Sequence, residues 1–115
     1  MTESELNKRI NKGESFLLAA DGQYLGRLSS NHYLFDGIMN EYGSYGSKYS
    51  STSIFNNYCR YGSQYSNLSP FNLFTPSPPK IYYKGIFVGY LSINQLVSPR
   101  IDPHQIFDYI INNGL

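Results

Sequence analysis

The sequence lacks several residues on which common folds depend: it has no tryptophan, one cysteine, two alanines and two valines among its 115 residues. Because alanine is the strongest helix former and allows helices to pack closely, its scarcity argues against a helical bundle. The single Cys59 cannot form an intrachain disulfide, so the domain must be stable without one. The 30 Ile, Leu, Phe and Val residues are still enough for a modest core, which argues against a disordered chain.

Long hydrophobic runs are also missing. No segment approaches the about 20 apolar residues of a membrane span, and the first apolar run, residues 16–20, is shorter than the about 7–15 residues of a signal-peptide core. The chain as written therefore has no signal peptide, which is typical of a cytoplasmic protein. An exported protein whose leader had been removed would have the same sequence, so the compartment stays open, and we expect no membrane contact.

Charge is scarce and unevenly placed. The net charge of +1 argues against a generally basic nucleic-acid binder, and the length leaves room for one domain, 1–115. No Asp or Glu occurs within 42–101, whereas five Lys or Arg and nine of the twelve tyrosines lie there. Cations interleaved with aromatic faces and with Ser and Asn donors suit an anionic ligand or a glycan.

Both ends of the chain carry helix signals. Thr2 and Glu5 form a capping-box pattern at the start of a short N-terminal helix. Near the other end, Asp102 has the position of an N-cap and Pro103 that of the first helical residue, which predicts a helix over 102–113. Its apolar face, expected in the core, consists of Ile106, Phe107, Ile110 and Ile111.

A duplication flanks the middle of the chain. Residues 21–31 align without gaps on residues 84–94 and share the pattern Gly-x-Leu-Ser-x-Asn. Each copy begins at an x-Gly turn that follows an apolar strand, so residues 16–31 and 80–94 are predicted to form two related hairpins within one small antiparallel sheet. Gly26 and Gly89 interrupt the returning strands, which predicts a bulge or a close approach where the hairpins pack.

A second repeat, with a period of 16 residues, occupies residues 33–74 in three copies. Ser53 and Ser69 have the positions of N-caps, and Asn56 or Asn72 stands three residues later, so each copy is predicted to open one short helical turn. Such a turn is too short to be stable alone and must be held by packed aromatic residues. The sequence therefore predicts an α+β fold in which a repeat-containing coil with short helical turns accompanies the sheet and the two terminal helices.

The repeats also carry a resemblance. The motif Tyr-Gly-Ser-x-Tyr-Ser-x-x-Ser-x-x-Asn-x-Tyr, with the upstream Gly-x-Leu-Ser-x-Asn, resembles a pattern in small, largely uncharacterised bacterial proteins, many of them exported. It covers about residues 21–74. The resemblance implies no activity, because none is assigned to that group. Members often have proline after the repeated asparagine, where this chain has Glu41, Asn57 and Leu73.

Enzymatic chemistry has suitable residue types but no pattern that gathers them. A nucleophile triad would need Cys59 with His32 or His104 and with Asp36 or Asp102. Cys59, however, occupies a position at which the other repeats have Gly or Thr, which is typical of a tolerated small residue. Neither histidine has a metal-ligand spacing to a partner, and no phosphate-binding glycine loop is present. We expect no enzyme, no metal and no cofactor.

These observations favour a non-enzymatic binding module that uses an acid-free surface rich in Tyr, Ser and Asn. Such residues suit an anionic small ligand, a glycan or a protein partner, since tyrosine gives contact area at low entropic cost. Nucleic acid is not favoured, because nothing in the sequence gathers the basic residues. The alternative is a structural or self-assembly domain, for example a homodimer paired through edge strands. The candidate ligand-binding residues are Tyr45, Lys48, Tyr49, Arg60, Tyr61 and Tyr65.

Overall fold

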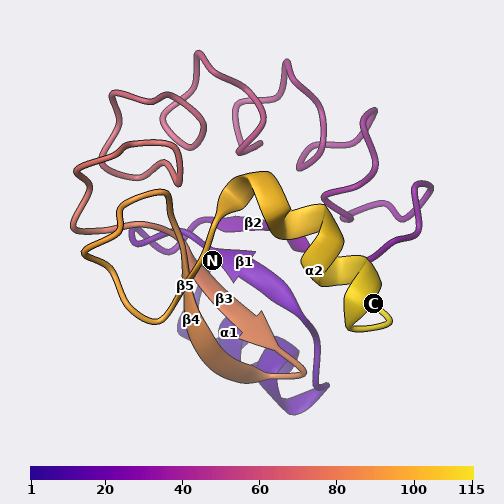
Figure 1. Ribbon diagram of the computed structural model, residues 1–115. Helices are drawn as coiled ribbons and strands as arrows, with labels where there is room; N and C mark the ends of the chain where they lie inside the picture. The colour runs from indigo at the N-terminus through magenta and orange to yellow at the C-terminus, as the bar shows by residue number, and fades with distance from the viewer.

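Five short strands form one sheet at the centre of the computed structural model, which describes all residues 1–115 (Figure 1). In chain order the elements are α1 (Glu3–Asn11), β1 (Phe16–Leu18), β2 (Tyr24–Arg27), β3 (Lys80–Tyr83), β4 (Ile86–Leu91), β5 (Arg100–Ile101), a 3-10 helix (Pro103–Gln105) and α2 (Ile106–Asn112). The sheet order is β2-β1-β3-β4-β5. The chain therefore has the α+β fold that its sequence predicts, with a helix near each end.

Both predicted hairpins are present and share the sheet. β1 pairs antiparallel with β2, and β3 pairs antiparallel with β4. The two hairpins join through β1 and β3, where Leu17 is opposite Ile81. The sheet is mixed rather than wholly antiparallel, because β5 pairs parallel with β4. A strand of two residues has no periodicity of its own, so its sequence carries no signal for it.

The duplication extends further in the structure than the sequence pattern. After the first hairpin, Gly37 forms a parallel bridge to Arg27 of β2. After the second, Arg100 pairs in parallel with Tyr90 of β4. Both partners are displaced by the 63 residues that separate the two sequence copies. Each copy is therefore a hairpin, a loop and a returning parallel segment, and the two copies lie on either side of the contact between β1 and β3.

The two strand glycines are sites of close approach, but not between the hairpins. Both have positive φ, +112° at Gly26 and +153° at Gly89. A Cβ on Gly26 would lie 2.6 Å from the Cβ of Tyr45 and 2.7 Å from a methyl carbon of Ile38, both in the coil. A Cβ on Gly89 would lie 2.8 Å from the carbonyl oxygen of Pro99. The glycines thus admit the segment that follows each hairpin, which corrects the predicted position of the contact.

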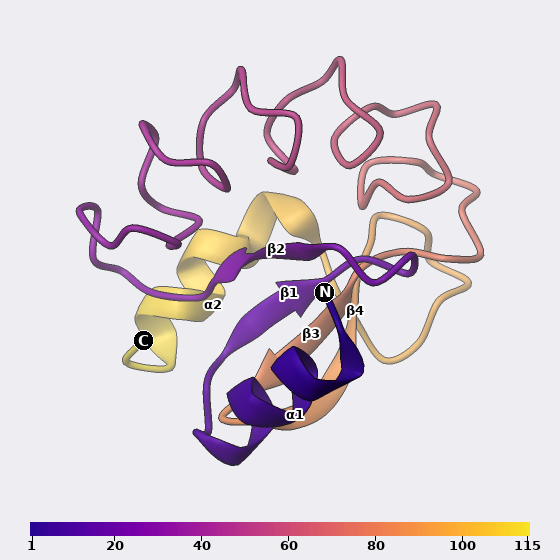
Figure 2. The same cartoon turned by 180° about the vertical axis from the view of Figure 1, so that it is seen from behind.

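The two helices cover opposite faces of the sheet (Figures 1 and 2). At α1 the predicted capping box is formed, with Glu5 N donating to Thr2 Oγ1 at 3.2 Å and Thr2 N donating to the Glu5 carboxylate at 3.3 Å. Leu6 and Ile10 of this helix pack on a small cluster that includes Phe16 of β1. Neither helix has the length or the apolar character that a bilayer crossing requires.

The C-terminal helix begins where the sequence predicts. The Asp102 side chain accepts a hydrogen bond from His104 N, although the first turn is a 3-10 helix and α2 proper begins at Ile106. Ile106 and Ile110 are buried in the main core, which also contains residues of β1, β2 and the coil. Phe107 and Ile111 stay exposed, so only half of the predicted apolar face belongs to the core.

The predicted helical turns are absent from the coil, which consists of consecutive β-turns. Asn56 N donates to the carbonyl oxygen of Ser53 at 3.2 Å, and Cys59 N donates to that of Asn56 at 3.3 Å. The Ser53 hydroxyl accepts from Phe55 N, two residues on, as a helix cap also can, but no bond from Asn57 N to the carbonyl oxygen of Ser53 follows to begin an α-helix. Serine and asparagine side chains that bond two residues ahead favour such turns over a helix.

The coil curves in a wide arc over α2, from one side of the sheet to the other (Figures 1 and 2). It leaves β2 at the edge of the sheet, and its last turns are bonded to the segment that follows β4. There Ile93 N donates to the carbonyl oxygen of Pro70 at 3.0 Å, and Asn94 Nδ2 donates to that of Thr75 at 2.9 Å. Toward the core the coil contributes Ile38 and Ile54.

Candidate functional site

Six aromatic side chains on the coil are exposed to solvent in a regular series. They alternate at intervals of nine and seven residues along the chain, and each has 83–97% of its surface accessible. We call this series the aromatic ladder; its members are Tyr33, Tyr42, Tyr49, Tyr58, Tyr65 and Phe74. Single exposed aromatics are ordinary on a protein surface, but six in a regular series are not.

One backbone device presents every ring of the ladder. The backbone N–H of the ring residue donates to an Asn or Ser side chain two residues earlier, as Tyr58 N does to Asn56 Oδ1 at 3.0 Å and Tyr65 N to Ser63 Oγ at 3.2 Å. Asn40, Asn56 and Asn72 also bond backward; Asn56 Nδ2, for example, donates to the carbonyl oxygen of Ser50 at 3.0 Å. Each ring therefore projects from a fixed backbone although little packs against it.

An exposed side chain of another kind precedes each ring. These neighbours are His32, Glu41, Lys48, Asn57, Gln64 and Leu73. All but the last have hydrogen-bonding groups, and none of them makes a side-chain hydrogen bond within the protein. Every turn tip but one thus offers a flat aromatic face beside a free polar group.

Pockets lie between successive rings from Tyr42 to Phe74. Their volumes are about 640 Å³ between Tyr42 and Tyr49, 400 Å³ between Tyr49 and Tyr58, 710 Å³ between Tyr58 and Tyr65, and 540 Å³ between Tyr65 and Phe74. Each neighbouring pair of pockets shares the ring that separates them. The rings and pockets together form one continuous corrugated groove along the coil.

The floor of this groove comes from inward repeat positions and from the C-terminal part of the chain. Phe55 lines the two pockets on either side of Tyr49, and its ring lies 5.4 Å from that of Phe107 in α2. Phe71 takes the equivalent place beneath Tyr65, with its ring 5.3 Å from that of His104. The exposed Phe107 of α2 is thereby explained as part of the groove.

The structure places three of the sequence-predicted site residues on the groove and three elsewhere. Tyr49 and Tyr65 are rings of the ladder, and Lys48 lines the pockets on both sides of Tyr49. Arg60 is exposed but lies outside these pockets, so the two predicted cations are not brought together in one of them.

The other two predicted site residues are structural anchors. Tyr61 is buried, and its hydroxyl donates to Asp21 Oδ2 at 2.8 Å; burial, followed by this hydrogen bond, raises the pKa of Tyr61 to about 12. Tyr45 is half-buried with its ring edge-on to Tyr24 at 5.1 Å, and burial raises its pKa. Both tyrosines point inward and fasten the coil to the first hairpin.

Four rings of the ladder escape the sequence-based selection: Tyr33, Tyr42, Tyr58 and Phe74. The signal that separates exposed from inward tyrosines is the residue two positions earlier. Exposed rings follow an Asn or Ser that bonds their backbone N–H, whereas Tyr45 follows Gly43 and Tyr61 follows Cys59. Among the coil tyrosines this spacing separates the two groups and was available in the sequence, whereas Phe55 and Phe71 also follow a serine that accepts their N–H and lie on the groove floor.

The acid-free stretch does not make the groove basic. Within residues 28–79 the cations Lys48 and Arg60 are matched by the anions Asp36 and Glu41, so the coil has a formal charge of zero. The remaining basic residues of the stretch belong to the sheet region. Among the residues that precede the rings, Glu41 is the one acidic residue and Lys48 the one Lys or Arg, so their formal charges cancel.

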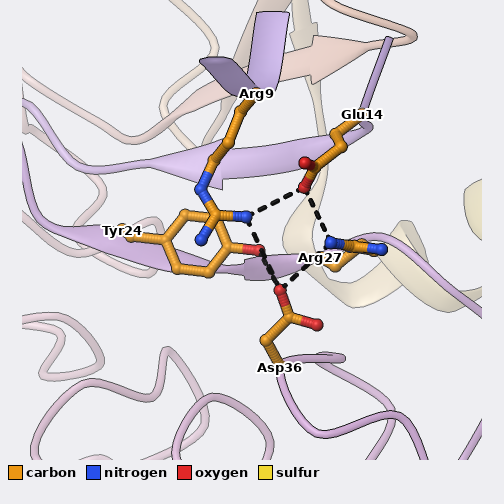
Figure 3. Close-up of polar contacts among 5 residues, drawn as sticks. All are labelled: Arg9, Glu14, Tyr24, Arg27 and Asp36. Atoms are coloured by element: carbon orange, nitrogen blue, oxygen red, sulfur yellow. Dashed lines mark hydrogen bonds and ion pairs between the residues drawn. The ribbon is translucent and has the colours of Figure 1, made fainter. Parts of the chain in front are cut away.

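A compact group of charged residues joins α1, β2 and the start of the coil (Figure 3), and none of its members lines a pocket between the rings. Glu14 Oε1 accepts from Arg9 at 2.9 Å and from Arg27 at 2.8 Å, and each arginine also lies 3.6 Å from Asp36. The Arg9 guanidinium stands 3.7 Å above the Tyr24 ring. With two charges of each sign the group is neutral and internally paired, so it serves to hold α1, β2 and the coil together.

The residue types of a nucleophile triad are not assembled. Cys59 is half-buried, and its thiol donates to the carbonyl oxygen of Ser53 at 3.3 Å. His104 Nδ1 lies 2.9 Å from Asp102, but this pair belongs to the helix cap. Burial raises the pKa of Asp102, but the hydrogen bonds from His104, together with the nearby charges of His104 and Arg100, bring it below its ordinary value, so the carboxylate stays ionised as a cap. No three His, Cys, Asp or Glu side chains are grouped to hold a metal ion.

The chain matches no protein-family model, no curated protein sequence and no solved structure.

Proposed function

We propose that the protein is a non-enzymatic binding module and that the aromatic ladder binds an extended, chain-like ligand. The observation that carries the proposal is the continuous groove in which five successive rings, Tyr42 to Phe74, enclose four pockets. A compact small ligand would need one concave pocket, whereas a row of similar pockets suits a ligand that repeats along its length.

The energetics of the exposed rings support a binding role. Each tyrosine of the ladder leaves most of its apolar surface in water, although burial of such a ring would stabilise the fold. The backbone that carries each ring is held by hydrogen bonds before any ligand arrives, so binding has to order the ring torsions but not the backbone. Several weak contacts on one chain then add up, since the first contact raises the effective concentration of the next.

The self-assembly alternative has less support. The outer side of β2 is already bridged by Gly37, and the opposite edge strand, β5, has only two residues. Neither edge offers a long row of free backbone groups to a second copy. A binding role for the ladder also does not require a dimer.

The proposal is tested by titrating isotope-labelled protein with three extended probes of different chemistry, followed by NMR. The probes are a neutral linear hexasaccharide, an oligothymidylate of about ten nucleotides and a decaproline peptide. We expect at least one of them to shift the amide signals of the ladder residues and of their neighbours Asn57 and Gln64. The double variant Tyr58→Ala with Tyr65→Ala should lose these shifts.

The matched control is Phe35→Ala, because Phe35 is 84% exposed on the same coil but lines none of the pockets between the rings. Its binding should equal that of the unaltered protein. If none of the three probes perturbs the ladder, or if binding maps to another face and survives the double substitution, the proposed function is wrong.

A further inference from the structure

We infer that the ligand of the aromatic ladder is a neutral linear polysaccharide; this inference rests on the proposed function. The pairing of each ring with a free polar side chain carries it. The two central tips present Tyr58 with Asn57 and Tyr65 with Gln64, and all four side chains line the largest of the four pockets between the rings. A sugar ring offers the same combination, an apolar C–H face with hydroxyl groups around its edge.

The carboxamides of Asn57 and Gln64 favour a polyhydroxyl ligand. Each carboxamide both donates and accepts hydrogen bonds, and a hydroxyl group can satisfy either role. Neither side chain bonds within the protein, and both are exposed, so their hydrogen-bonding groups are free for a ligand. Ser63, whose hydroxyl holds Tyr65 N at 3.2 Å, lines the same pocket. Polar and apolar residues thus line this pocket together, which suits a sugar ring, with its apolar face and polar edge, better than a purely apolar ligand.

The charge of the coil argues against a single-stranded nucleic acid. Such ligands also stack on rows of aromatic rings, but they require a positively charged groove that follows the phosphate backbone. The coil has a formal charge of zero, and of its two basic residues only Lys48 lines a pocket between the rings. Glu41 at the neighbouring tip would repel a phosphate. An uncharged chain meets no such penalty.

A proline-rich peptide fits less well for a different reason. Such peptides dock in aromatic-lined grooves, but proline has no backbone N–H and therefore cannot donate a hydrogen bond. The carboxamide oxygens of Asn57 and Gln64 would lose water without gaining a donor. Buried acceptors without partners cost free energy, so this pocket disfavours a polyproline segment.

Protein surfaces of other kinds are disfavoured by the spacing of the rings. A protein interface centres on a continuous apolar patch surrounded by polar residues. Here at least one polar side chain lines every pocket between the rings, as Asn57 and Gln64 do between Tyr58 and Tyr65, so the apolar surface is interrupted along the groove. Apolar residues predominate only toward its ends, for example Phe71, Leu73 and Ile93 between Tyr65 and Phe74. The alternation matches a ligand that presents its apolar faces at intervals, as a chain of pyranose rings does.

The test measures the dissociation constants of neutral oligosaccharides by calorimetry, with two, four and six units of β-1,4-linked glucose and of β-1,4-linked N-acetylglucosamine. We expect affinity to rise at least tenfold from the disaccharide to the hexasaccharide in one of the two series. Removal of one ring in Tyr58→Ala or Tyr65→Ala should weaken hexasaccharide binding by about two- to twelvefold, as expected for one aromatic contact. Phe35→Ala should leave it unchanged.

A second variant separates sugar recognition from stacking alone. Asn57→Leu with Gln64→Leu removes the hydrogen-bonding groups at two exposed positions and retains side-chain bulk, so the fold should be unaffected. We expect this variant to lose at least fivefold in affinity for the hexasaccharide while decaproline binding, if present, stays equal or increases.

The outcomes distinguish the inference from the proposed function. If decaproline or oligothymidylate binds the ladder and neither hexasaccharide does, the ligand class is wrong but the binding module stands. If the leucine variant binds the hexasaccharide as well as the unaltered protein does, the role of the carboxamides is wrong. If no probe binds at the ladder, the inference and the proposed function fail together.

Discussion

The hydroxyl of Tyr24 donates a hydrogen bond of 2.7 Å to Asp36 Oδ2 and so links β2 to the first turns of the coil (Figure 3). Tyr24 is buried in the hairpin, whereas Asp36 begins the segment that returns along β2. Burial, and then the hydrogen bond to Asp36, raises the pKa of Tyr24. The phenol therefore stays protonated and remains a donor throughout the physiological range.

Tyr24→Phe should destabilise the fold by about 1.5 kcal/mol, the lower end for a hydrogen bond to a charged group, because Asp36 keeps its two arginines. Urea unfolding followed by circular dichroism measures this change. The control is Tyr42→Phe, which alters an exposed hydroxyl and should change the free energy of unfolding by less than about 0.5 kcal/mol. Equal stabilities of the two variants would show that the Tyr24 hydroxyl does not hold the coil.

Substitution by alanine should lower the free energy of unfolding at Asn56 but not at the adjacent Asn57. Asn56 is buried and bonds both the Ser50 carbonyl and the Tyr58 amide, whereas Asn57 is exposed and makes no side-chain hydrogen bond. Asn56→Ala should lower the free energy of unfolding by about 2–3 kcal/mol, as expected for two hydrogen bonds lost at a buried site. Asn57→Ala should leave it within about 0.5 kcal/mol of the unaltered protein. Thermal unfolding of both variants measures the contrast, and similar losses would contradict the assigned role of Asn56.

Glycine in the Tyr-Gly-Ser segment is required by space and not by a left-handed backbone. Gly62 does not have positive φ, but a Cβ there would overlap the carbonyl oxygen of Asn56 and lie 2.8 Å from that of Ile54. Gly62→Ala should therefore destabilise the fold by about 3 kcal/mol or more, because backbone cannot move aside without opening the turn. Gly46 has the equivalent surroundings one repeat earlier.

The control for that substitution is Gly114→Ala. No atom lies within 4 Å of an added Cβ at Gly114, whose φ of +70° costs an alanine about 1 kcal/mol. Chemical denaturation of both variants gives the comparison. If Gly62→Ala lowers the free energy of unfolding no more than Gly114→Ala does, the turns of the coil are not packed as closely on one another as described.

Tyr61 should make the stability of the fold depend on pH in the alkaline range. Burial, and then its hydrogen bond to Asp21, raises its pKa from 10.0 to about 12, so the unfolded chain loses this proton first. The stabilising contribution is therefore complete below pH 10 and disappears as the pH rises through about 12. Urea unfolding at intervals from pH 9 to about pH 11.5 should show a smaller decline for Tyr61→Phe than for the unaltered protein. If stability declines equally in the two proteins, the pKa of Tyr61 is the same in the folded and the unfolded chain.

The regular elements follow from local signals that the sequence displays. The capping box of Thr2 and Glu5, the Asp102 cap and the two x-Gly turns each need only a few neighbouring residues, and all are formed. The positions of Gly26 and Gly89 correctly predict close approach. The segment that approaches each glycine, however, cannot be identified from neighbouring residues. The sequence alone therefore predicts a contact between the two hairpins, whereas each glycine contacts the segment that follows its own hairpin.

The coil and the site show where local reasoning is insufficient. Ser and Asn favour a helix cap and an isolated turn alike, and the bond from Phe55 N to Ser53 Oγ occurs in both. What decides between them is whether the following backbone bonds continue as a helix, and after Ser53 they do not. The same ambiguity affects the tyrosines, because period alone does not separate Tyr61, which points inward, from Tyr65, which points outward. The groove floor depends on Phe107 of α2, which is far away in the chain and has no sequence signal for that position.

Both ends of the coil are fixed to the sheet, and this limits how many rings the protein can offer. The coil starts at β2, and its last turn is bonded by Asn94, which follows β4. Each 16-residue repeat contributes two rings to the ladder. An inserted repeat would move Thr75 away from Asn94 and open that end of the coil. The distance between the two attachment points on the sheet therefore limits the ladder to six rings. A longer ladder would require additional strands beneath it.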